Sequence, residues 1–214
     1  MNEDDYEHVF INCPFDPEFE GLLYVMLFTI ISLGYYPKLS LGLNDSTTAR
    51  IDKIIQLIND SNYCIHDLSR IKATKKNDYF RLNMPFELGL DYGYKKFSAT
   101  PNAKDRKTLI LGEKEFEFAK SISDLAGMDI SYHKNNAEEL VKVIRNWFIG
   151  IKDIKSTPPY LIIWYKYIDF TGDFKIYATK CGCQDDQKLD IPIKEMISHM
   201  FEYIKTDPYP LNTF

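Results

Sequence analysis

The sequence contains few of the residues that mark several protein classes. Among its 214 residues there are only four cysteines, ten glycines and ten prolines. Such counts exclude a scaffold held together by disulfides and a glycine- or proline-rich fibrous chain. Because 45% of the residues are apolar and 14% are aromatic, the chain is also too apolar to be disordered. We therefore expect a globular protein, long enough for one domain and an appendage.

The chain also lacks an excess of basic residues and a long apolar run. Lys and Arg number 26 against 31 Asp and Glu, which gives a net charge of −5. An acidic balance disfavours a broad nucleic-acid surface, so a nucleic-acid partner is not expected. The chain starts with acidic residues where a signal peptide would be basic. The longest uncharged stretch, 21–37, contains Gly34 and Pro37 and is apolar on one side, which predicts a buried helix in a cytoplasmic protein without a membrane span.

Several motifs of enzyme and metal sites are missing. There is no glycine-rich phosphate loop of standard spacing, no Ser in a Gly-x-Ser-x-Gly turn and no His pair with the spacing of metal ligands. Cys181 and Cys183 have no second cysteine pair nearby, so we expect neither a metal site nor a bound cofactor. Cys13 and Cys64 lie in apolar, strand-like runs, where a free thiol behaves as a small apolar side chain.

Strand-like and helix-like patterns alternate through the first part of the chain. Asp16 is the expected N-cap of the first helix, and the spacing of Asn136 and Glu139 predicts a capping box for the helix after the last strand. Between the strands, apolar residues recur every three or four positions, as in helices that bury one side. Short apolar runs predict strands at 8–13, 35–41, 62–68, 107–111 and 128–132. This alternation is typical of an α/β domain with a flavodoxin-like or Rossmann-like, mainly parallel sheet and helices on both faces.

The sequence predicts a second, smaller unit at the C-terminus. The run Ser156-Thr157-Pro158-Pro159 marks a boundary, which separates residues 1–155 from residues 156–214. Tyr160–Phe170 and Phe174–Cys181 are rich in aromatic and β-branched residues on either side of a Thr-Gly-Asp turn, so we predict a hairpin, followed by a helix. A ββα piece of this size cannot bury its apolar face alone. We expect it to pack on the α/β domain or on a second copy of the chain, in a homo-oligomer.

Three polar segments are expected to meet at one edge of the sheet. In an open parallel sheet, ligands bind beyond the carboxyl ends of the strands. Residues 12–16 and 66–70 each follow a predicted strand there, and residues 83–87 open a helix. Glu87 stands out, because a carboxylate near a helix start can be desolvated yet kept charged by backbone N–H dipoles. That suits a nucleophile, or an anion that stabilises a cationic sugar transition state; the alternative is an ordinary helix-start acid.

The other polar residues of these segments allow two interpretations each. Asp67 is either a turn residue that accepts from its own backbone, or a hydroxyl acceptor or general acid. Asp16 is a cap first and a ligand contact second. Arg50 can pair with a phosphate, but a solvated helix residue is the simpler interpretation. His66 should point away from Asp67, as a packed histidine with its hydrogen bonds satisfied.

Taken in order, these segments resemble a known family. Residues 9–16 (VFINCPFD) resemble the opening of nucleoside 2-deoxyribosyltransferase-like proteins. Residues 54–69 (IIQLINDSNYCIHDLS) resemble their second helix, third strand and Asp turn. Residues 83–89 (NMPFELG) resemble their N-x-x-(aromatic)-E-L-G segment, which carries the nucleophilic glutamate. The arrangement is also similar to TIR domains, whose catalytic glutamate follows the third strand and whose enzymes cleave the nicotinamide–ribose bond of NAD.

The resemblance implies an enzyme that cleaves an N-glycosidic bond of NAD or of a nucleoside or nucleotide. Glu87 and Asp67 are then the catalytic residues, and no cofactor is needed beyond the substrate. Uncharacterised bacterial relatives resemble effectors of anti-phage defence, which implies a partner protein of such a system. The residues implied in substrate binding are Asn12, Pro14, Phe15, Asp16, Arg50, Ser69, Arg70 and Asn83.

Two further functions stay open on the sequence. One is a non-catalytic module for nucleotide sensing or assembly, since TIR-like folds also serve as adaptors. The other is a deoxyribosyl transferase of nucleoside salvage. The chain departs from a minimal transferase in its longer loop at 71–82, and the C-terminal piece belongs to the core of neither family.

Overall fold

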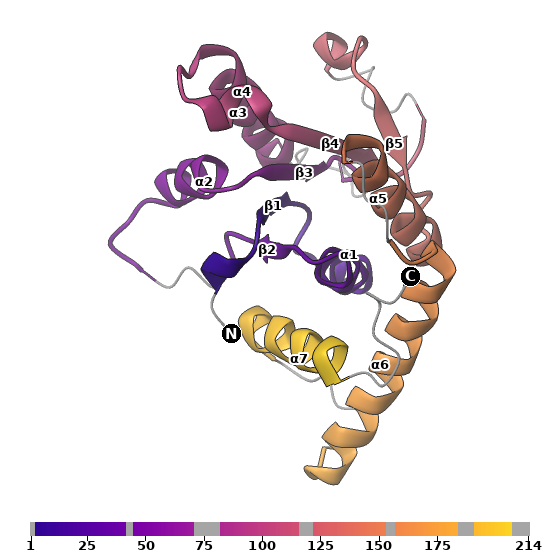
Figure 1. Cartoon of the computed structure of the whole chain (residues 1–214). Helices are drawn as coiled ribbons and strands as arrows, with labels where there is room; N and C mark the ends of the chain where they lie inside the picture. The colour runs from indigo at the N-terminus through magenta and orange to yellow at the C-terminus, as the bar shows by residue number, and fades with distance from the viewer. Residues whose placement is uncertain are drawn as a thin grey trace, which may run out of the picture.

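A computed structural model describes residues 3–41, 45–70, 82–115, 122–152, 157–183 and 191–206. The predicted boundary after residue 155, and the loop expected at 71–82 except for Leu82, lie outside these ranges. Figure 1 shows a twisted sheet between two layers of helices, with two further helices from the C-terminal part of the chain beside it.

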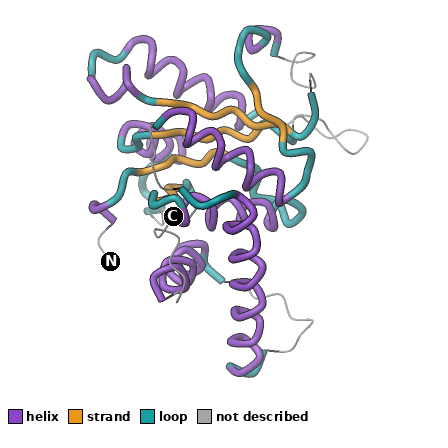
Figure 2. The backbone as a smooth tube through the Cα atoms, turned by 45° about the vertical axis from the view of Figure 1, so that its right-hand side comes forward, coloured by secondary structure: helices purple, strands orange, loops and turns teal. Residues whose placement is uncertain are grey.

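Five parallel strands form the sheet, which Figure 2 shows in orange. β1 (His8–Asn12) lies between β2 (Tyr36–Lys38) and β3 (Tyr63–Asp67), and β4 (Lys107–Gly112) and β5 (Ile130–Tyr132) complete the order β2-β1-β3-β4-β5. All four strand pairs are parallel, which confirms the predicted fold class. This is the order of flavodoxin-like sheets, in which the winding reverses between β1 and β3. A ligand is therefore expected at the carboxyl ends of these two strands.

Helices cover both faces of the sheet, as predicted (Figure 1). α1 (Glu20–Ser32) and α5 (Ala137–Ile151) pack on one face, and α2 (Arg50–Asn59) and α3 (Asn83–Phe97) pack on the other. The other helical segments that the structure describes before the C-terminal unit are short: α4 (Pro101–Asp105) and the 3-10 turns Glu3–Asp5 and Ser123–Leu125.

The two predicted helix caps have different outcomes. Asn136 accepts a hydrogen bond from the backbone N–H of Glu139 at 2.9 Å, so the predicted cap of α5 is confirmed. Asp16 accepts from the backbone N–H of Phe19 at 3.0 Å, but α1 begins only at Glu20. Asp16 therefore caps a turn that precedes the helix, and its prediction as the N-cap of α1 is wrong.

Alternation along the strands decides which side chains reach which helix layer. In β3, Ile65 packs with α1 and α5, whereas Cys64 packs with α2. Because successive side chains point to opposite faces, His66 lies on the α2 and α3 side and Asp67 on the α1 side. The register of β1 and β3 places Asn12 opposite His66. The prediction that His66 points away from Asp67 is confirmed.

The predicted C-terminal hairpin is wrong, and the C-terminal unit is helical. Tyr160–Lys180 form one continuous helix, α6, and Ile193–Thr206 form α7. The side chains of α6 that pack on the core recur every three or four positions: Tyr160, Ile163, Trp164, Tyr167, Phe170 and Phe174. The strand preference of aromatic and β-branched residues depends on what they pack against. In α6 they pack on the core only as a helix, so the helical spacing outweighs that preference. The Thr-Gly-Asp run lies within α6 on its exposed side.

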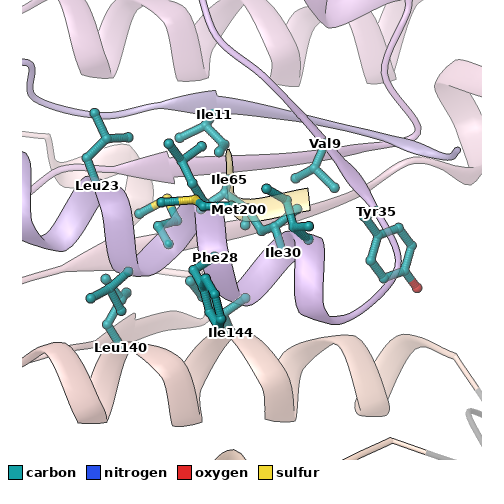
Figure 3. Close-up of a cluster of buried hydrophobic side chains, with 14 of the residues drawn as sticks. Val9, Ile11, Leu23, Phe28, Ile30, Tyr35, Ile65, Leu140, Ile144 and Met200 are labelled. Atoms are coloured by element: carbon teal, nitrogen blue, oxygen red, sulfur yellow. The ribbon is translucent and has the colours of Figure 1, made fainter. Parts of the chain in front are cut away.

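The C-terminal helices pack on the α/β domain and enclose α1. α6 contacts α1 and α5, and α7 contacts α1. The Phe28 ring of α1 lies 5.5 Å from the rings of Tyr167 and Phe170 and 6.1 Å from that of Tyr203. Met200 of α7 belongs to the same buried cluster (Figure 3). Across the described ranges, no helix combines the length and the apolar character needed to cross a membrane.

Candidate active site

A buried thiol at the carboxyl edge of the sheet is subject to the charges of the three predicted carboxylates. Cys13, which follows β1, is fully buried, and burial raises the pKa of its thiol well above the usual value. The negative charges of Asp67, Glu87 and Asp16 raise this pKa further. The end of β1, the end of β3 and the start of α3 meet at Asn12, which contacts both His66 and the Met84 carbonyl oxygen.

Glu87 is a desolvated carboxylate with few partners. It lies near the start of α3 and is 4% exposed. Its ion-pair partner is Arg50 at the start of α2, whose Nη2 lies 3.7 Å from Oε1. Within the described part of the chain, no hydrogen bond reaches the Glu87 carboxylate. Burial raises the pKa of Glu87, and the half-exposed guanidinium of Arg50 offsets this only in part.

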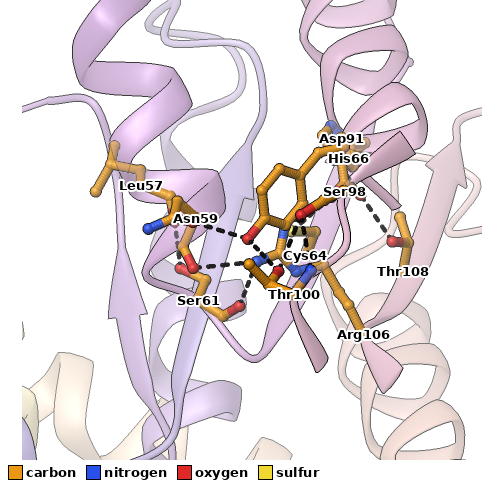
Figure 4. A network of polar contacts seen from close by, with 11 residues as sticks. Leu57, Asn59, Ser61, Cys64, His66, Asp91, Ser98, Thr100, Arg106 and Thr108 are labelled. Atoms are coloured by element: carbon orange, nitrogen blue, oxygen red, sulfur yellow. Dashed lines mark hydrogen bonds and ion pairs between the residues drawn. The ribbon is translucent and has the colours of Figure 1, made fainter. Parts of the chain in front are cut away.

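Asp91 lies one turn further along α3, on the same buried side, and has the opposite surroundings (Figure 4). Its carboxylate accepts hydrogen bonds from Thr108 Oγ1 at 2.7 Å, from Arg106 Nη1 at 3.2 Å and from Cys64 Sγ at 3.4 Å. His66 Nε2 lies 3.4 Å away. Burial by itself raises the pKa of Asp91, but His66, Thr108 and Arg106 outweigh it and hold the pKa well below the usual value.

The two carboxylates of α3 therefore differ in what they can do. Asp91 has four polar partners and is held as an anion, so its role is to anchor α3 to β3 and β4. Glu87, near the start of α3, has a raised pKa, an ion pair with Arg50 and no hydrogen bond from the described residues. Of the two, Glu87 is the carboxylate that is left to take part in a reaction.

Asn12 fixes the position of the ring proton of His66. The Asn12 side chain is buried, and its Nδ2 lies 2.9 Å from the carbonyl oxygen of Met84 and 2.9 Å from His66 Nδ1. An amide nitrogen only donates hydrogen bonds, so His66 Nδ1 must accept. The ring proton then sits on Nε2, which faces Asp91. Asn12 is predicted to bind substrate, yet both of its N–H groups are used inside the protein.

We expect nitrogen-15 NMR to find the His66 proton on Nε2 and none on Nδ1. Asn12→Asp should move the proton to Nδ1, because a carboxylate accepts where the amide donates. The signal of His66 is identified by its loss in His66→Gln. Asn136→Asp is the matched control, since Asp is as good a helix cap as Asn, and it should leave the signal unchanged. A proton on Nδ1 in the wild type would contradict this assignment.

Cys64, His66 and Asp91 also lie close enough to hold a metal ion. Their ligand atoms are within 4.8 Å of one another, and all three residues are buried. However, His66 Nε2 carries a proton, and Arg106 shares the Asp91 carboxylate. Burial raises the pKa of the Cys64 thiol well above the usual value, so the thiolate that a metal prefers is disfavoured. These side chains form a hydrogen-bond network that suits the fold better than a metal.

Asp67 is fully buried, and its side chain lies against the backbone of Ser69 and the ring of His133. Oδ1 accepts from the backbone N–H of Ser69 at 2.9 Å, as in the turn that is one of its two predicted roles. Oδ2 lies 3.1 Å from His133 Nε2. His133 has no place in the sequence-based site, although it directly follows β5 at the same edge of the sheet, which is the signal that could have found it.

Ser69, His133 and Asp67 do not form a catalytic triad. Ser69 Oγ lies 2.7 Å from His133 Nε2, the same nitrogen that faces Asp67. The other nitrogen, Nδ1, accepts from the backbone N–H of Asn135 at 3.1 Å, so the ring proton sits on Nε2. A triad needs the Ser and the Asp on opposite nitrogens of the ring, with Nε2 free to accept the Ser proton. The cluster instead joins the end of β3 to the turn after β5.

The remaining predicted residues are less closely associated with Glu87. Arg70 Nη2 lies 3.6 Å from Asp16 Oδ1 and 3.2 Å from Glu18 Oε2, so Arg70 joins the loops after β1 and β3. Pro14 is buried. Asn83 is exposed and is the first residue of α3.

Two predicted residues border a cavity between the α/β domain and the C-terminal helices. Phe15 and Asp16 line this cavity of about 400 Å³ together with Leu41, Ile191 and Lys194, among others. Glu87 is not among the residues that line it. The structure thus brings Glu87 together with Arg50, whereas the cavity that involves Phe15 and Asp16 lies against the start of α7.

Comparison of the sequence with models of protein families gives no match, and comparison with curated proteins gives none either.

Proposed function

We propose that this chain cleaves the N-glycosidic bond of NAD or of a nucleoside or nucleotide, with Glu87 as the reacting carboxylate. The observation that carries the proposal is the state of Glu87: buried, with a raised pKa, without a hydrogen bond from the described residues, and at the carboxyl edge of a parallel sheet. The motifs that resemble nucleoside 2-deoxyribosyltransferase-like proteins and TIR domains support the same residue.

The chemistry follows from what a desolvated carboxylate does to a sugar. As the bond from C1′ to the base nitrogen breaks, its electron pair leaves with the base and positive charge develops at C1′ and the ring oxygen. The Glu87 carboxylate either bonds to C1′ or stabilises this cation, and water then supplies the hydroxyl group and releases a proton. Burial strengthens the attraction between the carboxylate and the cation, because few waters screen it.

The surroundings of Asp67 favour a leaving group that departs without a proton. Oδ1 accepts from the backbone N–H of Ser69, Oδ2 lies 3.1 Å from His133 Nε2, and the whole side chain is 0% exposed, so Asp67 presents no oxygen at the surface from which a departing base could take a proton. Nicotinamide leaves NAD as a neutral molecule from a cationic ring and needs no acid. A purine needs protonation as it departs. NAD is therefore the substrate we favour within this class.

Asp67→Asn should leave NAD cleavage within about tenfold of the wild-type rate. A purine deoxynucleoside, whose base must be protonated as it departs, should be cleaved at least about 10²-fold more slowly than NAD by the wild type, and Asp67→Asn should change that rate no more than the rate with NAD. The two rates are measured on the same preparation by chromatography of nicotinamide and of free purine. Ser69→Ala, which removes the hydroxyl contact to His133 but keeps the backbone N–H that Asp67 binds, serves as the control for local damage. Loss of NAD cleavage in Asp67→Asn alone would contradict this assignment.

In the cell, such an activity would deplete a nucleotide pool. The resemblance to bacterial anti-phage effectors supports a cytoplasmic role of that kind, with a partner protein that triggers the enzyme. A non-catalytic nucleotide sensor would differ in one measurable way, since it would bind a nucleotide without forming a product.

Product analysis tests the proposal directly. The full chain is incubated with NAD, with a purine or pyrimidine deoxynucleoside, and with a deoxynucleoside plus an acceptor base. Release of nicotinamide or of free base supports hydrolysis, and product only with the acceptor base supports deoxyribosyl transfer. Thermal stabilisation by NAD without any product would favour the sensor and would argue against the proposed enzyme.

A further inference from the structure

The side of α6 that faces away from the core carries a stripe of exposed apolar residues. Leu161, Tyr165, Ile168 and Ile176 are 40%, 61%, 42% and 55% exposed. Gly172 completes the stripe, so the spacing along the helix is four, three, four and four residues, which keeps the stripe on one side of the helix. α6 extends beyond the α/β domain (Figures 1 and 2), and each apolar side chain of the stripe is at least 40% exposed.

The stripe is complementary to itself when two copies of α6 run antiparallel. With Ile168 near the middle, Tyr165 of one copy lies opposite Gly172 of the other, and Leu161 lies opposite Ile176. A Cβ atom at Gly172 would meet no atom within 4 Å, so there is room above it for a tyrosine ring. By symmetry the contact between Tyr165 and Gly172 occurs twice. A parallel pair would instead place the two tyrosines at one level and the two glycines at another.

Charged residues beside the stripe fit the same arrangement. Lys166, Asp169 and Asp173 lie on one flank of the exposed stripe, at successive turns of α6. In an antiparallel pair related by a twofold axis, a flank of one helix faces the same flank of the other. Lys166 of one copy then lies between the levels of Asp169 and Asp173 of the other. The two Asp169 side chains lie near the twofold axis, and the Lys166 side chains on either side of them offset their like charges.

We propose that two copies of this chain form a twofold-symmetric dimer in which α6 packs antiparallel against α6. The helix has 21 residues and is therefore about 30 Å long, which gives room for the five positions of the stripe from each copy. The interface is isologous: each copy contributes the same residues, and the tyrosine of each fills the gap at the glycine of the other.

Sedimentation equilibrium of the full chain tests the dimer. The wild type should show a concentration-dependent monomer–dimer equilibrium. Gly172→Leu should weaken dimerisation by about tenfold or more, because the new side chain occupies the space of the partner tyrosine at both symmetric contacts. Leu at position 172 also favours the helix in the monomer and enlarges its exposed apolar surface. If the chains associated only through unspecific apolar contacts, Gly172→Leu would therefore strengthen association. Gly150→Leu, at an exposed glycine of α5, is the matched control and should change nothing.

Exchange of charges tests the antiparallel register. Lys166→Asp and Asp173→Lys should each weaken the dimer by about 2- to 30-fold, since each change acts at two symmetric contacts. The double variant, with both changes, should regain most of the loss. A wild type that stays monomeric up to the highest concentration, tighter association of Gly172→Leu, or a double variant weaker than either single change would overturn the proposal.

Discussion

Glu87→Gln is expected to reduce the rate of N-glycosidic bond cleavage by about 10³-fold or more. Glutamine keeps the size of the side chain but carries no negative charge, so it neither bonds to C1′ nor stabilises the cation that develops there. The change should act on kcat more than on KM, because the charge is needed chiefly in the transition state. Initial rates of nicotinamide release from NAD measure both quantities.

The same variant should be at least as stable as the wild type. Burial raises the pKa of Glu87, which means that the folded protein carries a carboxylate in an unfavourable place. Removing that charge removes the penalty, so we expect an unchanged or higher melting temperature together with lost activity. Glu202→Gln on α7 makes the same chemical change at an exposed position and should alter neither property. A Glu87→Gln enzyme that turns over NAD at the wild-type rate would end the proposed mechanism.

The pH dependence of both properties follows from the raised pKa of Glu87. Its folded-state pKa lies above the ordinary value of 4.5, so the ionised, active form is lost as the pH falls through that higher value. The acid limb of the kcat profile should therefore lie above pH 4.5. Since protonation relieves the burial penalty, the stability difference between wild type and Glu87→Gln should shrink over the same pH range.

Asp91→Leu is expected to lower the free energy of unfolding by about 3–5 kcal/mol. The Arg106 guanidinium is buried against Asp91 and otherwise bonds to the carbonyl oxygens of Ser61 at 2.8 Å and of Asn59 at 3.4 Å. Without the Asp91 carboxylate, a buried positive charge has no counter-ion. Urea unfolding followed by circular dichroism measures the loss, with the urea dependence of the free energy checked for a change in slope.

The double variant Asp91→Leu with Arg106→Met separates the charge pair from the packing of the site. With both charges replaced by apolar side chains, much of the lost stability should return. The wild type should also lose the contribution of Asp91 in acid. Its pKa is depressed below 3.8, so this contribution is present above pH 3.8 and disappears as the pH falls through the lower, folded-state value. A double variant that is less stable than Asp91→Leu would contradict the assignment.

The strands could be predicted because each depends on a local pattern, whereas α6 could not. Residues 62–68 are apolar and bounded by polar residues, and β3 occupies 63–67 of them. In α6, aromatic and β-branched residues suit a strand as well as a helix. What decides between them is Phe28 of α1, which is far away in the sequence and packs on Tyr167 and Phe170. Only the folded chain contains that information.

For the candidate site, the sequence predicts the position of the main residue but not its chemical surroundings. The sequence predicts where Glu87 lies, because the start of a helix after the third strand has one position in this fold. Its chemical state depends on burial and on Arg50, which comes from another helix. Nothing in the local sequence marks Asp91, since its partners arrive from β3, from β4 and from the residue that precedes β4. Asn12 is recognised as part of the motif, but its bond to the Met84 carbonyl shows only in three dimensions.

The enclosure of α1 joins the two parts of the chain into one unit of unfolding. Phe28, Leu27 and Ile30 are completely buried, and α6 and α7 supply part of that cover. Detaching these helices would bare the aromatic side of α1 to water, and such a surface favours aggregation over an independent fold. Burial of the apolar side of α1 therefore stabilises the α/β domain and the C-terminal helices at the same time. We expect the two parts to unfold together in one cooperative transition.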